Sequence, residues 1–587
     1  MILNFFKILF RHFVKRRIYT IINILGLAIG ITSFILIMMY VFDELSYDRH
    51  YSKADRVVRV CMIYDFGGVG ENSASMPFPV AYTLKSEYPD MIKEVTRVFN
   101  FQSDRSLLEY EGRKFNESRF FFADSTFFEI FGQEFISGDP ATSLDEPNSV
   151  VITESTARKY FQDEDPMGKV FKFEAVLPLK VTGVIRDVSR QTHLRFDFMA
   201  SLSSMKSIWG GRLPGTWVWN PCWTYVLLEE GVVPSQLEAN FPSFIRNFYY
   251  DAQRESIVMY LQNLTDIHLH SRLDYEIRPN SNYAYIVVLS VIAVFLLIIA
   301  SINFMNLATA TAGNRAREIG IRKVTGADRL KLISQFIGES LIMTLIAFIL
   351  SLLLIEIFLP SFNDLTDKQI NFSFLLDPVN LLYLAGLWFV LGVLSGAYPA
   401  LYMSSFRPIS ILRGSPVSAA RTGLARKILV VFQFTISIGL VIGTIMIFRQ
   451  VNYLRQADLG FNPDNIIMMR INQTKVSRDF ETFRNEVLKN PDIVNITALD
   501  DIIGESHNTH EFWFEGMKDK EWRFFPALVV RYDFLETFGI RLVAGRDYNR
   551  ENRTDPEKGL LVNESLVKHM GWPSNEEALG KKFRSLS

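Results

Sequence analysis

The chain has 587 residues, and its 62 Lys and Arg nearly balance 63 Asp and Glu to give a net charge of −1. This balance excludes a bulk electrostatic attraction to nucleic acid. Only Cys61 and Cys222 could form a disulfide, so a disulfide-rich scaffold is excluded and two unpaired thiols are the default expectation. Hydrophobic residues make up 49% of the chain and gather in a few blocks, which indicates a membrane protein.

The chain begins with a short cationic segment, residues 1–17. Its basic residues alternate with Leu and Phe at spacings of three or four, which predicts an amphipathic helix at the cytoplasmic membrane surface. Residues 18–42 are uncharged and predict the first membrane span. This block is too long for a signal peptide, and no small-residue cleavage site precedes Asp43, so we expect an uncleaved anchor.

Residues 43–282 mix helical and strand-like patterns, which predicts an α+β domain with its own core. Helices are expected at 78–88, 124–131, 153–161 and 234–249. Strands are expected at 91–100, 149–152, 169–174, 179–187, 222–229 and 256–261. The glycine run at 67–70 is interpreted as a loop rather than a phosphate site. His268 and His270 are interpreted as residues of a structural strand rather than metal ligands.

Four further apolar blocks exceed the roughly 20 residues needed to cross a bilayer. They predict spans at 283–311, 332–359, 378–402 and 428–448, with the third ending at Pro360. Basic residues assign 1–17, 312–331 and 403–427 to the cytoplasm. The segments 43–282, 360–377 and 449–587 then lie outside the cytoplasm.

The predicted spans carry almost no ionisable side chains. Glu339 and Glu356, near the ends of the third span, are the exceptions. An interfacial position is expected for Glu339, with pairing to a basic loop residue as the alternative. Ion-coupled carriers need polar groups at mid-membrane depth, so the pattern argues against a proton- or sodium-driven transporter.

The loop between the second and third spans, residues 313–335, is densely basic. Glu318 lies four residues before Arg322, the favourable order for an ion pair on a helix. Gly326 can end this helix, and Asp328 can cap the next one. The sequence therefore predicts two helical pieces separated by a tight turn. An ordinary basic loop that only orients the chain is the alternative.

The segment 449–587 repeats part of the first outer domain. The matching pairs are 127–139 with 534–547, 150–161 with 560–570, and 168–171 with 580–583. Their order is kept, which indicates an internal duplication. The first unit has a span, an outer domain and three spans, whereas the second has a span and a partial outer domain. The chain is therefore expected to lack three further spans.

Motifs for nucleotide binding, nucleophilic catalysis and zinc hydrolysis are absent from the sequence. Gly168-Lys169 and Gly580-Lys581 lack both the glycine-rich loop and the following hydroxyl residue of a phosphate-binding loop. No catalytic residue, metal or cofactor is predicted for this chain, so an energy source has to come from another protein.

Three sets of residues resemble FtsX-like permeases, the membrane subunits of ABC transporters that include the macrolide-exporter (MacB) and lipoprotein-releasing types. The sets are 316–323 with 326–327, 335–336 and 339–340; 396–400 with Ser404, Pro408 and Gly414; and 43–48 with 54–56. The resemblance is closest to the large eight-span form with two outer domains. It implies a multi-pass α-helical membrane protein with α+β extracytoplasmic domains and an internal duplication.

The resemblance also implies a mechanism and partners. The helix at 313–325 would dock on a separate cytoplasmic ATPase that uses ATP and would transmit motion to the outer domains (mechanotransmission). The implied interface comprises Arg315, Arg317, Glu318, Ile319, Arg322, Lys323 and Gly326. Further implied partners are a second permease copy, a periplasmic adaptor and the bilayer of the bacterial inner membrane, with efflux or extraction of a substrate as the outcome. A membrane sensor that moves no cargo is the alternative.

Overall fold

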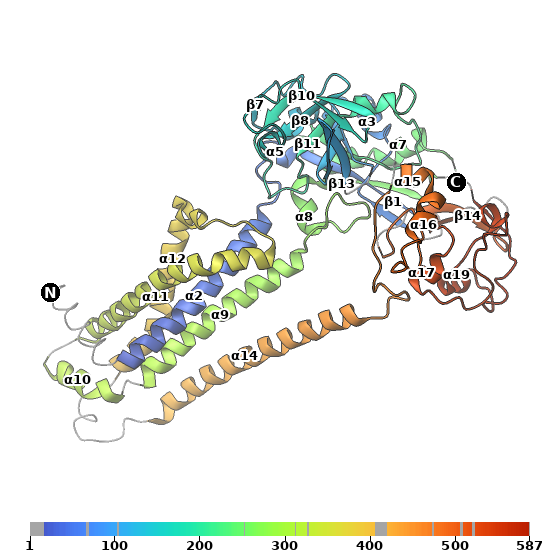
Figure 1. The fold of residues 1–587 in the computed structure, drawn as a ribbon. Coiled ribbons are helices and arrows are strands. Elements are labelled where there is room, and N and C mark those ends of the chain that lie inside the picture. Colours follow the sequence, from blue (N-terminus) through green and yellow to red (C-terminus); the bar gives the residue numbers. More distant parts are fainter. Residues whose placement is uncertain are drawn as a thin grey trace. The chain divides into compact units, whose positions relative to one another are not determined.

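The computed structural model describes residues 17–65, 70–101, 105–251, 253–310, 313–325, 328–405, 419–471, 475–504, 509–518 and 523–585. It divides into two compact units (Figure 1). A membrane unit comprises Met1–Ser46 and Ser281–Gln456, and an outer unit comprises Tyr47–Asn280 and Ala457–Ser587. The amphipathic helix predicted in 1–17 and most of the glycine run at 67–70 lie outside the described residues.

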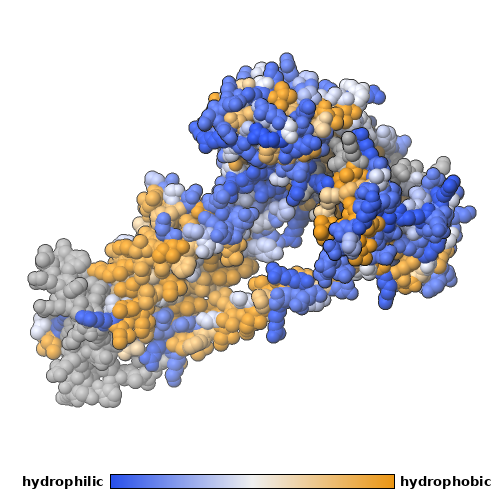
Figure 2. Space-filling model, viewed as in Figure 1, coloured by the Kyte–Doolittle hydropathy of each residue, from blue (hydrophilic) through white to orange (hydrophobic). Residues whose placement is uncertain are grey.

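In the described part of the membrane unit, five helices are long and apolar enough to cross a membrane. They are α2 (Arg17–Leu45), α9 (Tyr283–Ala310), α11 (Arg329–Thr366), α12 (Pro378–Ser404) and α14 (Ala419–Gln456). Figure 2 shows their surface as predominantly hydrophobic, in contrast to the outer unit. Because lipid replaces water around these helices, their apolar side chains can remain exposed.

The packing of α2 against α9 depends on a glycine. A Cβ at Gly30 would lie 2.6 Å from the Cβ of Ala300, so only glycine permits the two helices to approach this closely. On its other side α2 packs against α11, which in turn packs against α12.

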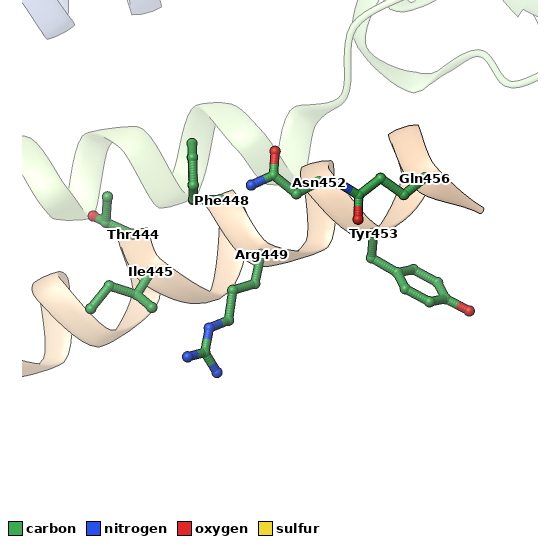
Figure 3. Close-up of a pocket in the computed structure, with 7 residues that line it drawn as sticks. All are labelled: Thr444, Ile445, Phe448, Arg449, Asn452, Tyr453 and Gln456. Atoms are coloured by element: carbon green, nitrogen blue, oxygen red, sulfur yellow. The ribbon is translucent and has the colours of Figure 1, made fainter.

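Helix α14 packs against α9 but leaves most of its apolar side chains exposed. Figure 3 shows a surface hollow near the end of this helix, with Phe448 and Arg449 extending to different sides. The hollow is lined by Thr444, Ile445, Phe448, Arg449, Asn452, Tyr453 and Gln456. Because a single helix supplies all of these residues, the hollow is open rather than an enclosed binding site.

Helix α11 continues through Pro360 to Thr366, beyond the residue at which the third span is expected to end. Proline removes one backbone hydrogen bond from a helix, and the neighbouring residues supply other contacts. Asn363 bonds both the N–H (3.1 Å) and the C=O (2.9 Å) of Ile370, and Asp367 ends the helix in a left-handed conformation.

The first outer domain is built on a mixed 13-stranded sheet with the order β13-β1-β12-β3-β6-β11-β8-β10-β9-β4-β5, in which β2 also pairs with β1 and β7 with β10. Strands β6–β11 and β8–β10 pair in parallel. The strands are β1 (Val57–Tyr64), β2 (Glu71–Ser73), β3 (Ile92–Phe99), β4 (Ser106–Tyr110), β5 (Arg113–Glu117), β6 (Phe120–Ala123), β7 (Phe135–Ser137), β8 (Ser149–Thr153), β9 (Val170–Phe173), β10 (Leu177–Ile185), β11 (Phe198–Ser201), β12 (Trp223–Leu228) and β13 (Ile257–Asn263).

Short helices cover this sheet and complete three hydrophobic clusters. They are α3 (Val80–Glu87), α4 (Phe127–Phe131), α5 (Glu154–Phe161), α6 (Pro234–Glu238), α7 (Phe241–Phe248) and α8 (Ile267–His270), with 3₁₀ turns η1 (Ala54–Arg56), η2 (Leu202–Ser207) and η3 (Leu264–Asp266). The strand predicted for His268 and His270 is wrong, since both lie in α8. His268 is buried there and stacks on Tyr47 with ring centroids 3.4 Å apart.

Cys61 and Cys222 are both free and buried. Burial is the main cause that raises the pKa of Cys61 to about 11 and that of Cys222 to about 12. Both thiols therefore stay protonated and unreactive at neutral pH.

The second outer segment contains a three-stranded sheet in the order β15-β14-β16. Its elements are α15 (Lys475–Arg478), α16 (Phe480–Val487), β14 (Thr509–Phe514), β15 (Arg523–Pro526), α17 (Phe534–Phe538), α18 (Asp555–Lys558), α19 (Glu564–His569) and β16 (Phe583–Ser585).

The predicted duplication appears in the local structure of this second segment. Helices α4 and α17 each end at a glycine with positive φ, Gly132 (58°) and Gly539 (64°). Helices α5 and α19 each begin with a side-chain cap, from Thr153 and Asn563 respectively. The same sequence pattern therefore forms the same turns and caps twice.

Candidate coupling sites at the two ends of the membrane helices

The predicted coupling segment forms α10 (Gly313–Val324), followed by the first residues of α11. The two predicted helical pieces are therefore present. Asp328 occupies the N-cap position of α11, but its carboxylate lies 3.4 Å from Lys331 Nζ and does not cap the helix. The side chains of Arg315, Arg317 and Glu318, and Gly326 as a whole, lie outside the described residues, so their interface roles remain predictions.

Ile319 fastens α10 to the base of the membrane unit. Its side chain is 3% exposed and belongs to a cluster with Leu332, Phe336, Ala400 and Met403, from α11 and α12. Burying an isoleucine side chain stabilises a contact by roughly 1.5–3 kcal/mol, which is enough to hold a short amphipathic helix in place.

Arg322 continues this attachment through a chain of polar side chains. Its Nη1 donates to Gln335 Oε1 at 2.7 Å, and Gln335 Nε2 donates to Glu339 Oε1 at 3.2 Å. Glu339 is only 9% exposed, so its carboxylate is buried between the helices. It connects to the basic segment through Gln335, because a buried carboxylate needs hydrogen-bond partners.

Lys323 binds the end of α12. Its Nζ donates to the backbone oxygen of Ser404, the last residue of that helix, at 2.6 Å. Burial, followed by the nearby charge of Arg329, lowers the pKa of Lys323. A lysine at this position satisfies an orphan carbonyl and complements the negative end of the helix dipole. We call Ile319, Arg322 and Lys323 with their partners the α10 anchor.

Three of the exposed side chains near the anchor are apolar. Ile321 and Val324, three positions apart on α10, are 51% and 64% exposed, and Leu330 at the start of α11 is 78% exposed. The sequence did not predict a contact role for these residues, because arginines and lysines dominate the segment. The spacing of Ile321 and Val324, at i and i+3 on a basic helix, could have indicated a shared apolar face.

The opposite end of the membrane unit carries a buried charge cluster, the Lys368 clamp. Lys368 Nζ lies 2.8 Å from Asp43 Oδ2 and 2.5 Å from Glu44 Oε1, both in the last turn of α2. It also lies over the ring of Tyr40, 5.4 Å from the centroid. The clamp ties the end of α2 to the segment that follows α11.

Three residues beyond α2, Asp48 enters the outer unit and is completely buried. Thr192 Oγ1 donates to its carboxylate at 2.6 Å, and His193 Nδ1 lies 3.0 Å from Asp48 Oδ2. His193 Nε2 in turn bonds the hydroxyl of Tyr225 on β12 at 2.7 Å. We call these four residues the Asp48 hub.

The electrostatics of the Asp48 hub favour a charged carboxylate. Burial alone would raise the pKa of Asp48, but the charge of His193 and hydrogen bonds from Thr192 and His193 outweigh it and lower the pKa. Asp48 is therefore an anion at physiological pH, held by the segment between β10 and β11. Asp48 belongs to the 43–48 run that resembles FtsX-like permeases, but the sequence predicted no role for this residue.

The chain is held in a similar way where it leaves the outer domain. Arg59 on β1 is fully buried, and its Nη1 lies 2.7 Å from Glu276 Oε2. Glu276 lies seven residues before Tyr283, the first residue of α9. Ionic contacts within the outer domain thus hold the chain near the points where it enters and leaves this domain.

Two parts of the chain match known families. Residues 20–243 match the MacB-like periplasmic core domain, and residues 290–408 match the FtsX-like permease C-terminal domain. The chain belongs to the FtsX-like, MacB-type permeases of ABC transporters. It is a membrane protein with an extracytoplasmic domain of the MacB-like type.

Individual relatives give the extent of the similarity. The macrolide export ATP-binding/permease protein MacB of Bdellovibrio bacteriovorus is 30% identical over 21% of this chain and 19% of its own length. An uncharacterized ABC transporter permease, YvrN of Bacillus subtilis, is 21% identical over 60% of this chain and 86% of its own. The periplasmic region of MacB from Actinobacillus actinomycetemcomitans aligns over 36% of this chain and 91% of its own, with 16% identity and a TM-score of 0.28. The chain spans half or less of the first MacB relatives that it matches.

Proposed function

We propose that this permease couples ATP hydrolysis by a separate cytoplasmic ATPase to movement of its extracytoplasmic domains, for export or extraction of a substrate. The observation that carries the proposal is the short link between α2 and the outer domain. The Lys368 clamp holds residues 43 and 44, and the Asp48 hub holds residue 48, so only three residues separate the two attachments. Three residues leave little slack for α2 to move without displacing the outer domain.

The α10 anchor supports the same mechanism at the other end. Because α10 is bonded to α11 through Arg322 and to α12 through Lys323, a force applied to α10 reaches both helices. In this proposal Ile319, Arg322 and Lys323 attach the lever to the bundle. Ile321 and Val324 would contact the ATPase beside Arg315, Arg317 and Glu318. The names of the MacB relatives favour export as the direction of transport.

The test separates docking from attachment. The complex of the permease with its ATPase is purified from native membranes, and ATPase activity and the amount of bound ATPase are measured. Ile321→Asp with Val324→Asp is expected to reduce bound ATPase at least tenfold, because charged side chains cannot enter an apolar contact.

Arg322→Ala with Lys323→Met is expected to leave bound ATPase within about threefold but to abolish the permease-dependent change in ATPase rate. Leu382→Asn, at a position exposed on α12, serves as the control for membrane insertion. Wild-type behaviour of both double variants would contradict the proposed function.

A further inference from the structure

Four arginines of the first outer domain lie near the point where the N–H of Asp197, two residues after Arg195, donates to the carbonyl of Arg119 at 2.9 Å. They are Arg119, Arg190, Arg195 and Arg278, and we call them the arginine cluster. The hydrophobic core fixes their positions. Arg195 lies between the buried residues Leu194 and Phe196, and Ile277, next to Arg278, packs against the same hydrophobic cluster.

The arginine cluster has little negative charge to balance it. Arg119 Nη2 pairs with Asp197 at 2.7 Å, whereas in the described part of the chain no acidic group forms an ion pair with Arg190, Arg195 or Arg278. Two nearby carboxylates bind elsewhere. Asp187 accepts hydrogen bonds from Ser155, and Glu117 pairs with Lys159 at 2.6 Å. Four positive charges thus face the carboxylates of Asp197 and Asp187, which leaves a net positive charge.

Arg195 is the half-buried member of the cluster. Burial, together with the positive charges of the three other arginines, lowers the pKa of its guanidinium. Like charges that are not neutralised disfavour the charged form, so an anion bound among them would be stabilised. Arginine suits phosphate in particular, because its planar guanidinium donates two parallel hydrogen bonds to phosphate oxygens.

Two members of the arginine cluster, Arg190 and Arg278, are connected to membrane helices by short pieces of chain or by a single backbone hydrogen bond. Arg278 is five residues before Tyr283, where α9 begins, and five residues reach at most about 18 Å. Gln191, next to Arg190, accepts the N–H of Asp48 at 2.9 Å, and Asp48 is three residues beyond the end of α2. The chain therefore keeps these arginines within reach of lipid headgroups.

We propose that the arginine cluster binds the phosphate of anionic phospholipid headgroups in the extracytoplasmic leaflet. Each arginine near an anionic surface contributes roughly a fivefold factor to such binding, and salt screens the attraction. The bound lipid would hold Arg190, Arg278 and the segments that carry them at the bilayer surface. The proposal is independent of the ATPase, so it can fail or hold without affecting the proposed coupling function.

The experiment uses the full chain in nanodiscs of phosphatidylcholine, with and without 30% phosphatidylglycerol (on the order of the charge density of natural anionic membranes). Amide hydrogen exchange is followed in the peptides that cover 188–197 and 274–280. Phosphatidylglycerol is expected to slow this exchange at least threefold in the wild type. The triple variant Arg190→Gln, Arg195→Gln, Arg278→Gln is expected to lose the effect, as is the wild type at high salt.

A matched triple variant, Arg113→Gln, Lys114→Gln, Lys172→Gln, removes three exposed charges on β5 and β9 and is expected to behave like the wild type. If the half-buried Arg195 proves necessary for folding, the exposed pair Arg190→Gln, Arg278→Gln is compared instead. Equal exchange in the two lipid compositions, or equal protection in the wild type and the variants, would overturn the proposal. Protection by inorganic phosphate in pure phosphatidylcholine would assign the site to a soluble phosphate and overturn the lipid assignment.

Discussion

At the scale of single residues, ionic side chains join segments that lie far apart in the sequence. Asp48 and Lys368 are hydrophilic residues in chain segments that an ordinary hydropathy profile treats as connections. Each is buried with partners distant in sequence, such as His193 for Asp48. A buried ionic group without its partner is strongly unfavourable, so these pairs fix one conformation.

Replacing Asp48 by Asn is expected to destabilise the outer domain by about 3 kcal/mol, because it removes the anion that His193 and Thr192 bind. The pKa of Asp48 is lower in the folded state than its ordinary value of about 3.9. Its contribution is therefore fully present above about pH 4 and is lost as the pH falls through the folded-state pKa. Urea unfolding of the wild type and the variant between pH 3 and 7 measures the difference.

In that experiment Asp55→Asn, an exposed aspartate seven residues away, is the control and should change stability by less than about 0.5 kcal/mol. The assignment fails if the difference between wild type and Asp48→Asn stays constant down to pH 3.

Lys368→Met is expected to lower the thermal stability of the membrane unit. The substitution leaves Asp43 and Glu44 in contact without their cation, and a buried unpaired charge costs about 3 kcal/mol or more. The thermal midpoint of the detergent-solubilised chain reports the effect. The triple variant Lys368→Met, Asp43→Asn, Glu44→Gln should recover most of the lost thermal stability. If it does not, the clamp has another role.

At the scale of elements, the sequence predicted most of what periodicity and length control. The five apolar helices are present, and the helix expected at 153–161 forms as α5. Strands β1 and β6 were not predicted because they are buried on both faces and so lack alternation. Helix α11 continues beyond Pro360, where Asn363 bonds the backbone of Ile370, and this contact between residues seven positions apart is not visible in a hydropathy pattern.

Contacts between elements also explain why the sequence did not predict which side chains of α10 face the bundle. Charge pattern and spacing located α10, but they do not show which of its faces is covered. The partners of Arg322 and Lys323 come from α11 and α12, 13 and 81 residues later. Such long-range contacts decide that these two basic residues point inward and that Ile321 points outward.

Two glycines in similar sequences give a prediction about helix packing. Residues 26–30 read GLAIG in α2, and residues 439–443 read GLVIG in α14. Gly30 lies against Ala300, whereas nothing lies within 4 Å of a Cβ at Gly443. Gly30→Leu is therefore expected to destabilise the membrane unit by roughly 1–3 kcal/mol through overpacking, whereas Gly443→Leu should be nearly neutral.

The thermal midpoints of the two purified leucine variants are compared with that of the wild type. Equal losses in both variants would mean that glycine flexibility, rather than the close contact with Ala300, is what the helix requires.

At the scale of the whole molecule, the proposed coupling depends on one continuous mechanical route. It runs from α10 through the bundle to α2, and then through three residues into the Asp48 hub. Helix α2, which contains no proline, is stiff because its backbone hydrogen bonds are internal. The link between Glu44 and Asp48 is therefore the part of the route where added flexibility would have the largest effect.

Inserting Gly-Ser-Gly between Ser46 and Tyr47 tests this route. Flexible residues of this kind add several ångströms of slack without changing either attachment. Cysteines introduced at Leu365 and Val176, which are 84% and 74% exposed, allow spin labelling because the native thiols are buried. In the wild type the distance distribution between the labels is expected to shift when ATP is added with the ATPase. The insertion should abolish this shift while ATPase activity stays within about twofold.

The same insertion between Gly210 and Gly211, in an open loop, should leave the shift unchanged. If the shift survives the insertion at Ser46, motion reaches the outer domain by a route other than α2, and the return segment that Arg59 holds at Glu276 becomes the connection to test.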